Sequence, residues 1–177
     1  MNNKLITRSV FVIFTLCLFA CSEPIKTFTA TDNVQVLPYQ FLMPELDRQR
    51  SIRLYLPPSY QTSIKRYPVI YMHDGQNLFD DMTAYTGEWQ VDESLNQLAE
   101  KQDLEVIVVG IDNGGDFRMN ELSPWENKRF GKAQGKQYMD FIVEIVKPYI
   151  DTNFRTQSDR LHTAIMGSSM GGLISHY

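Results

Sequence analysis

Residues 161–172 read LHTAIMGSSMGG and carry the strongest structural signal in the chain. The run LHTAIM is short and largely apolar, which is typical of a strand that is buried on both faces. It leads directly into Gly167-Ser168-Ser169-Met170-Gly171, a G-x-S-x-G sequence, and an apolar segment that begins with glycine follows. The stretch therefore predicts a strand, a sharp turn and a helix in immediate succession.

This succession is the context of a nucleophile elbow, in which a strained turn exposes a serine hydroxyl above a sheet. Ser169 occupies the central position, whereas Ser168 is expected to serve the turn or the packing. Gly167 and Gly171 lack side chains, so neighbouring backbones can approach the turn. The backbone N–H of Met170 would then face a developing oxyanion. The alternative is a Gly- and Ser-rich turn without catalysis, because the motif alone arises by chance.

The rest of the sequence predicts an α/β fold. Residues 34–42 and 51–56 alternate apolar and polar side chains, which predicts an antiparallel strand pair. Residues 67–73, 104–111 and 161–166 are apolar runs typical of covered parallel strands. Helical patterns fill residues 91–102 and 137–150, where Pro148 is expected to kink the second helix. Strands that alternate with helices predict a mainly parallel, doubly wound sheet.

Ligands bind beyond the carboxyl ends of the strands in such sheets. Three segments should therefore meet at one edge: residues 73–80, residues 111–125 and the serine turn. The loop after the 67–73 strand should supply a second oxyanion donor, the N–H of Gly75 or Gln76, and Gly75 allows a tight turn there. We expect His73 to be a structural histidine and Asp74 to brace the loop.

Four motifs, YMHDGQNLFD, VVGIDNGG, ELSPW and MGSSMGG, occur in this order. Together they resemble the putative-esterase family of the α/β-hydrolases, which includes enterochelin-type, feruloyl and acetyl-xylan esterases, S-formylglutathione hydrolases and mycolyltransferases. The resemblance covers roughly residues 34–177. It implies that Ser169 is the acyl-accepting nucleophile, with Met170 and the Gly75 loop as oxyanion donors. It also implies that the substrate pocket is lined or supported by Asn113, Arg118, Glu121 and Trp125. The alternative is a loop held by its own hydrogen bonds, with Trp125 as a surface plug.

The resemblance thus implies a serine carboxylic-ester hydrolase that acts on a small-molecule or polysaccharide-linked ester without a cofactor. An acyltransferase of the same family, in which a sugar hydroxyl replaces water, remains an alternative. A second alternative is a non-catalytic lipoprotein that binds glycans or siderophores through loop aromatics. These aromatics are Phe79, Tyr85, Trp89, Phe117 and Trp125.

A hydrolase triad on this fold runs serine, acid, histidine along the chain. The residues after Ser169 contain no acid, and their histidine is His176. His176 would lie about two helical turns, or ~10 Å, from the serine, whereas a base needs hydrogen-bond reach. We therefore expect the N-terminal portion of an α/β-hydrolase, with later strands and the triad acid and histidine missing, and inactive on its own.

Residues 10–20, VFVIFTLCLFA, follow a basic N-terminus and are typical of a signal-peptide core. They end at Cys21, which resembles a lipobox cysteine. We expect a signal peptide at 1–20, a lipidated Cys21, a tether at 21–33 and a domain at 34–177. The predicted location is the periplasmic side of a bacterial membrane, with membrane contact through the lipid alone. Cleavage by an ordinary signal peptidase is the alternative.

Charge and composition exclude other classes of function. The net charge is -4 and no basic stripe occurs, so nucleic acid is not an expected partner. The chain has two cysteines, and removal of residues 1–20 would leave only Cys21, so no disulfide is expected. The three histidines are scattered, and no cluster of Cys and His indicates a metal site.

Overall fold

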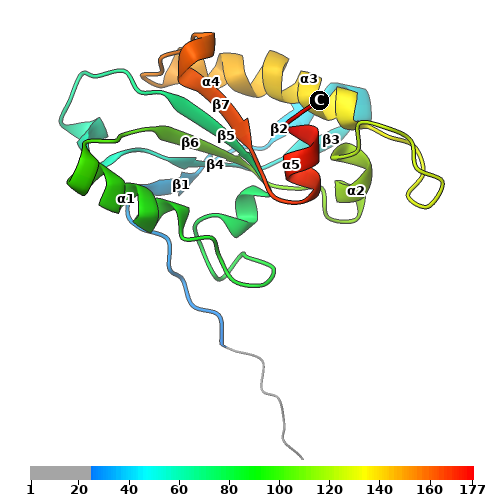
Figure 1. Ribbon diagram of the computed structural model, residues 1–177, viewed down its shortest axis with the longest axis horizontal. Coiled ribbons are helices and arrows are strands. Elements are labelled where there is room, and N and C mark those ends of the chain that lie inside the picture. Colours follow the sequence, from blue (N-terminus) through cyan, green and yellow to red (C-terminus); the bar gives the residue numbers. More distant parts are fainter. Residues whose placement is uncertain (1–24) are drawn as a thin grey trace, which may run out of the picture.

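The computed structural model describes residues 25–177. A five-stranded sheet with the strand order β1-β4-β6-β5-β7 forms the centre of the molecule, with helices above and below it (Figure 1). The predicted signal peptide and Cys21 lie outside the described residues. None of the helices in the described part is long and apolar enough to cross a membrane.

The N-terminal strands differ in detail from the prediction. β1 (Val34–Val36) pairs antiparallel with β4 (Ile52–Tyr55), which confirms the expected antiparallel pair. The strand predicted for residues 34–42 is wrong as a single element, because it breaks at Pro38, which has no N–H for a sheet ladder. Its second part becomes β2 (Phe41–Met43), which pairs with β3 (Arg48–Arg50) in a separate two-stranded sheet.

The three apolar runs form parallel neighbours, as predicted, but the expected cover on both faces is wrong for residues 163–166, which alternate half-buried and exposed at the edge of the sheet. β5 (Val69–His73) lies between β6 (Ile107–Ile111) and β7 (Thr163–Met166) and is parallel to both. The register pairs His73 with Ile111 and Met72 with Met166, so the carboxyl ends of the three strands are level. The loops that follow them therefore begin at one edge of the sheet.

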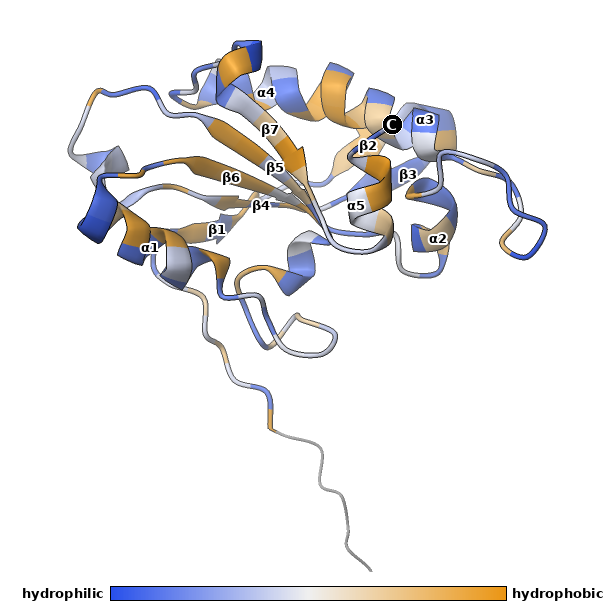
Figure 2. Ribbon diagram, viewed as in Figure 1, coloured by the Kyte–Doolittle hydropathy of each residue, from blue (hydrophilic) through white to orange (hydrophobic). Residues whose placement is uncertain are grey.

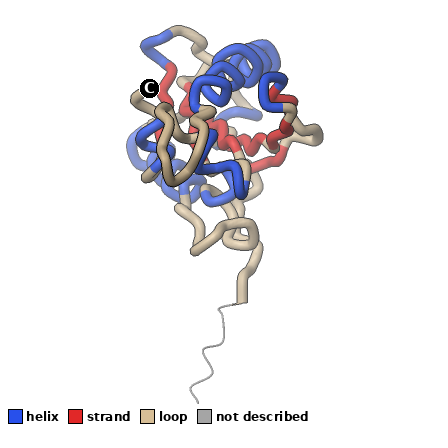
Figure 3. Tube along the Cα trace, turned by 90° about the vertical axis from the view of Figure 1, so that its right-hand side faces the viewer, coloured by secondary structure: helices blue, strands red, loops and turns tan. Residues whose placement is uncertain are grey.

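The two faces of the sheet are covered by different helices. α1 (Val91–Gln102) packs on one face, where Val91 and Leu95 meet a buried cluster that includes Met72 and Val108. The helices of residues 135–153 and α5 (Met170–Ile174) pack on the opposite face. Figure 3 shows helices on either side of the strands. Figure 2 shows that the strands between these layers are largely hydrophobic.

The helix predicted for residues 137–150 runs longer and changes its winding in the middle. α3 (Gly135–Phe141) passes into a π-helical turn (Ile142–Val146) and then into α4 (Lys147–Asn153). Pro148 lies in the first turn of α4, where its missing N–H leaves a carbonyl of the preceding turn without its α-helical partner. The distortion expected at Pro148 thus takes the form of a π-helical turn just before it.

The end of the predicted tether contacts the domain. The N–H and Oγ1 of Thr31 both donate to Asp92 Oδ2, and the side-chain amide of Asn33 donates to the Leu56 carbonyl and to Asn96 Oδ1. These bonds fix the chain entering β1 against α1.

Candidate active site

Ser169 lies on a strained turn between β7 and α5. Its backbone has φ 53° and ψ -117°, values that a residue with a side chain rarely adopts. The residue is exposed, and its carbonyl accepts the N–H of Leu173 at 3.0 Å as the helix begins. The turn therefore holds the Ser169 side chain at the carboxyl edge of the sheet.

Gly167 and Gly171 allow this turn to rest on His73. A Cβ atom on Gly167 would lie 2.9 Å from His73 Cδ2, and one on Gly171 would lie 3.1 Å from His73 Cβ. A Cβ on Gly167 would also lie 3.0 Å from the backbone of Gly171. The two glycines are thus required by close packing between the turn and the end of β5.

His73 is completely buried beneath the turn. Its Nδ1 lies 2.8 Å from the hydroxyl of Tyr138, and its Nε2 has no hydrogen-bond partner among residues 25–177. Burial lowers the pKa of His73, the Asp74 charge raises it in part and the Arg118 charge lowers it, and the net value is about 4. The imidazole is therefore neutral at pH 7. Tyr138, which the sequence placed among core residues of a helix, is the partner that sequence reasoning missed.

The turn after β5 comes equally close to β6. Gly75 begins a 3-10 turn (Gly75–Asn77), and a Cβ on it would lie 2.7 Å from the carbonyl carbon of Gly110 and 2.9 Å from Asp112 Oδ1. The left-handed residue of this turn is Asp74, with φ 57°. Gly75 is therefore needed for close approach to β6, whereas the sharp bend expected at Gly75 is made by Asp74.

Asp74 is buried and is held by two residues from the loop after β6. Arg118 donates to both of its carboxylate oxygens at 2.6 and 2.7 Å, and Asn113 Nδ2 donates to Oδ1 at 2.6 Å. Burial alone would raise the pKa of Asp74, but these hydrogen bonds and the Arg118 charge lower it. Gln76 Oε1 accepts the N–H of Asn113 at 3.1 Å and adds a further link between the two loops.

Glu121 lies inside the protein and does not line an open pocket. It is 1% exposed and pairs with Arg48 at 2.7 Å and with Arg50 of β3. The resemblance implied that Glu121 lines or supports the substrate pocket, and its burial is compatible only with support. Trp125 is 66% exposed on the same loop.

The loop aromatics do not form one set. Phe79 is buried in the core cluster with Leu78 and Val108, so its expected part in a binding surface is wrong. It follows the 3-10 turn by two residues and packs on the face of the sheet that α1 also covers. Phe117 stacks under the guanidinium of Arg48 at 3.6 Å. The side chains of Tyr85, Trp89 and Trp125 are exposed.

The oxyanion donors expected from the sequence lie on the two turns just described. Met170 is the first residue of α5, and Gly75 and Gln76 open the 3-10 turn. The first N–H groups of a helical turn have no acceptor within it and are available to other groups. Ser168 is exposed beside Ser169, and His176 is exposed at the end of α5.

A mixed sheet with parallel strands, helices on both faces and a serine at the turn after β7 is the architecture of an α/β-hydrolase. Residues 43–177 match the sequence model of the family described as Putative esterase, and the chain belongs to this family. The resemblance inferred from the four motifs and the predicted fold class are thereby confirmed.

Individual relatives agree with this assignment. The chain is 30% identical over 135 residues to the uncharacterized protein YbbA of Bacillus subtilis (strain 168), covering 72% of this chain and 50% of YbbA. A solved IroE-like serine hydrolase from Shewanella oneidensis is 26% identical with a TM-score of 0.63, over 79% of this chain and 44% of that one. A solved ferulic acid esterase is 27% identical with a TM-score of 0.54, over 79% of this chain and 52% of that one. The chain thus spans about half the length of these relatives.

Proposed function

We propose that this chain carries the nucleophile and the oxyanion donors of a serine carboxylic-ester hydrolase. The observation that carries the proposal is the backbone of Ser169, whose φ of 53° and ψ of -117° are found at an exposed serine between a parallel strand and a helix. Strain of this kind costs about 1–3 kcal/mol and persists where the surroundings enforce it. Membership of the Putative esterase family and the likeness to an IroE-like serine hydrolase support the same function.

In the proposed reaction, Ser169 Oγ attacks the ester carbonyl carbon and its proton passes to a general base. The carbonyl oxygen becomes an oxyanion, which accepts hydrogen bonds from the N–H of Met170 and from Gly75 or Gln76. The alcohol then leaves with the proton, and water releases the acid from the acyl-serine in a second cycle. Removing one donor from such an oxyanion site typically costs about a hundredfold or more in rate.

His73 is poorly suited to be the general base. Its Nδ1 is engaged by Tyr138, the residue is fully buried, and a pKa of about 4 makes it a weak proton acceptor at neutral pH. We therefore place the base and its carboxylate partner in the part of the relatives that this chain does not cover, which is about half of YbbA. The 177-residue chain alone is then expected to be almost inactive.

Hydrolysis of p-nitrophenyl acetate by the 177-residue chain tests both parts of the proposal. We expect a slow, saturable turnover of the size that an oxyanion site and binding can supply without a triad, roughly 10³–10⁴ over water. This residual turnover does not need the serine hydroxyl, so the nucleophile is tested by slow acetylation of the chain, followed by mass spectrometry. Ser169→Ala should abolish the acetylation at the turn, and Ser168→Ala, its matched control, should retain it. Acetylation of the turn that survives Ser169→Ala would overturn the nucleophile assignment. Turnover at ordinary esterase rates, on the order of 10 s⁻¹, would overturn the placement of the base.

Export with lipidation of Cys21 is a further part of the proposal, supported by the apolar run and the cysteine that ends it. Labelled palmitate should enter the expressed protein, and Cys21→Ala should prevent its incorporation. Incorporation that is unchanged in Cys21→Ala would contradict this part alone.

A further inference from the structure

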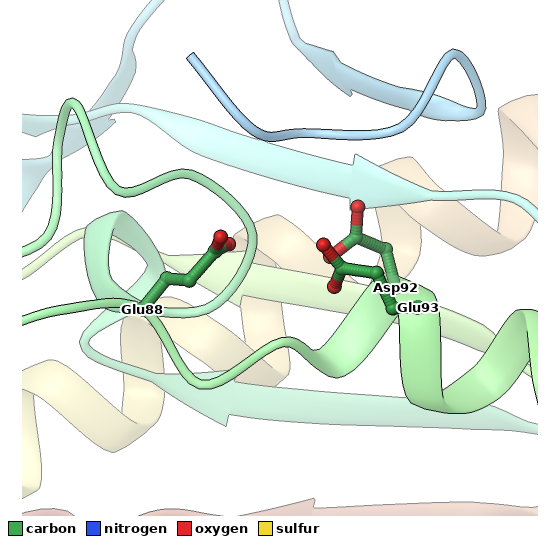
Figure 4. A group of neighbouring side chains, drawn as sticks. All are labelled: Glu88, Asp92 and Glu93. Carbon is green, nitrogen blue, oxygen red and sulfur yellow. The ribbon is translucent and has the colours of Figure 1, made fainter. Parts of the chain in front are cut away.

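Three carboxylates converge where α1 begins. Glu88 precedes the helix, and Asp92 and Glu93 lie in its first turn. One oxygen from each lies within 4.8 Å of the others. Figure 4 shows the carboxylates of Asp92 and Glu93 close to one another, with the side chain of Glu88 extending toward them.

Each of the three carboxylates has one buried oxygen without a hydrogen-bond partner among residues 25–177. These oxygens are Glu88 Oε2, Asp92 Oδ1 and Glu93 Oε2. Among residues 25–177, no lysine, arginine or histidine forms an ion pair with any of the three. Like charges at this separation repel, so the arrangement calls for a positive group between them.

Asp92 provides an independent indication that the cluster is built for a ligand. Its side chain is 0% exposed, and its Oδ2 accepts the N–H and Oγ1 of Thr31 at 2.8 and 2.7 Å. These two bonds fix the carboxylate and leave Oδ1 facing Glu88 and Glu93. A fully buried, unpartnered carboxylate oxygen carries a large desolvation penalty unless a cation or a proton meets it.

We propose that Glu88, Asp92 and Glu93 bind a divalent cation, and that the cation is calcium. Three carboxylates without nitrogen or sulfur ligands are the donor set of a hard cation. Calcium takes oxygen ligands at about 2.3–2.6 Å in flexible geometry, whereas magnesium demands near-ideal octahedral geometry at about 2.0–2.1 Å and keeps several of its waters, so a set of three protein carboxylates favours calcium. Water completes the coordination, since three monodentate carboxylates supply fewer ligands than the six to eight that calcium takes.

This site was not predicted from the sequence, because its ligands are carboxylates and not cysteines or histidines. The spacing of the three acids in EWQVDE, with Glu88 four residues before Asp92, was the available signal. A bound cation would tie together three parts of the chain. Asp92 holds Thr31 ahead of β1, and the segment from Glu88 is bound to the turn after β5 through Trp89 N–H to Asn77 O at 2.9 Å and Val91 N–H to Leu78 O at 3.1 Å.

Isothermal titration of the EDTA-treated, dialysed chain with CaCl₂ tests the proposal. We expect one calcium per chain and a rise in the thermal midpoint that EDTA reverses. Glu88→Gln/Glu93→Gln, which keeps the bonds between Asp92 and Thr31, should weaken calcium binding at least tenfold. Glu100→Gln removes an exposed acid from the same helix and should leave calcium binding unchanged.

Several outcomes would overturn the assignment. Absence of calcium binding at millimolar concentration would show that a shared proton, and not a cation, relieves the cluster. Magnesium binding without calcium binding would reject the choice of ion. Equal calcium affinity in Glu88→Gln/Glu93→Gln and in the parent chain would place the ion elsewhere. None of these measurements depends on esterase activity, so they test the cation site independently of the proposed function.

Discussion

The Nδ1 atom of His73 lies 2.8 Å from the hydroxyl of Tyr138, and this bond joins the end of β5 to α3 directly beneath the serine turn. Gly167 and Gly171 leave room for the imidazole, so the turn, the strand and the helix pack through one side chain. The position of Ser169 therefore depends on a neutral histidine that is bonded on one nitrogen.

The first prediction concerns the protonation of His73. Because burial lowers its pKa to about 4 from about 6.5 in the unfolded chain, the folded state binds fewer protons between these values. Stability should rise with pH from about 4 to about 6.5, and the contribution, roughly 3 kcal/mol at most, should be lost on acidification. Histidine NMR titration should show one imidazole that stays neutral at pH 5.5. Titration of every histidine near pH 6.5 would contradict the burial of His73.

The second prediction concerns the ion pair between Asp74 and Arg118. Arg118→Met leaves a buried carboxylate without its cation and should lower the free energy of unfolding by about 3 kcal/mol. Asp74→Asn/Arg118→Met removes both charges, and asparagine tolerates the left-handed φ of 57°. Urea denaturation should therefore find the double variant more stable than Arg118→Met. A double variant at least as unstable as the single one would show that the pair contributes no coupling.

The third prediction concerns the close approach of Gly75 to β6. Gly75→Ala places a methyl group 2.7 Å from the carbonyl carbon of Gly110, so the turn must shift. We expect a loss of about 1–3 kcal/mol in the free energy of unfolding. Gly115→Asn is the control, because nothing lies within 4 Å of a Cβ there and asparagine accepts its φ of 58°. The expectation fails if the two variants are equally stable.

The fourth prediction concerns backbone strain at Ser169. Glycine has no Cβ and adopts φ 53°, ψ -117° at little cost, although it also gives the unfolded chain more freedom. Ser169→Gly should therefore raise the free energy of unfolding by about 1 kcal/mol. Ser169→Ala keeps the Cβ and should not show this gain. Thermal and urea denaturation that rank alanine above glycine would show that the turn is unstrained.

The fifth prediction concerns the outer edge of β7. In the described part of the chain, β7 is the last strand of the sheet, and it carries the exposed Ala164 and Met166. An exposed apolar edge invites pairing with other chains, and a lysine there discourages it. Ala164→Lys should reduce concentration-dependent light scattering by the 177-residue chain, whereas Thr62→Lys, the same charge in an exposed turn, should not. Equal scattering by both variants would exclude the edge as the site of association.

Local patterns predicted most of the fold. The helical stripe over residues 91–102 gave the bounds of α1, and the three apolar runs gave the parallel strands within a few residues. β3 was missed because its residues are Arg48, Gln49 and Arg50, which show no apolar alternation. Arg48 and Arg50 form ion pairs with Glu121, which lies far along the chain. The local pattern of apolar and polar residues does not show such a distant partner.

The candidate site was predictable where the backbone conformation restricts which residues can be present. Glycines around a sharp turn identified Ser169, because only residues without side chains fit there. The partners of His73 and Asp74 were not predictable, since Tyr138 and Arg118 become neighbours only when the helices and loops pack. Tyr138 also fits the apolar face of its helix, so its second role as a hydrogen-bond partner left no separate signal.

The strand order β1-β4-β6-β5-β7 has a consequence for synthesis on the ribosome. β5 emerges before either of its neighbours, because β6 begins at Ile107 and β7 at Thr163. Until β6 and β7 have been translated, the backbone of β5 lacks its hydrogen-bond partners and its apolar side chains stay exposed. A nascent chain of this topology can therefore bind chaperones, or associate with other unfolded chains, until β7 has been synthesised.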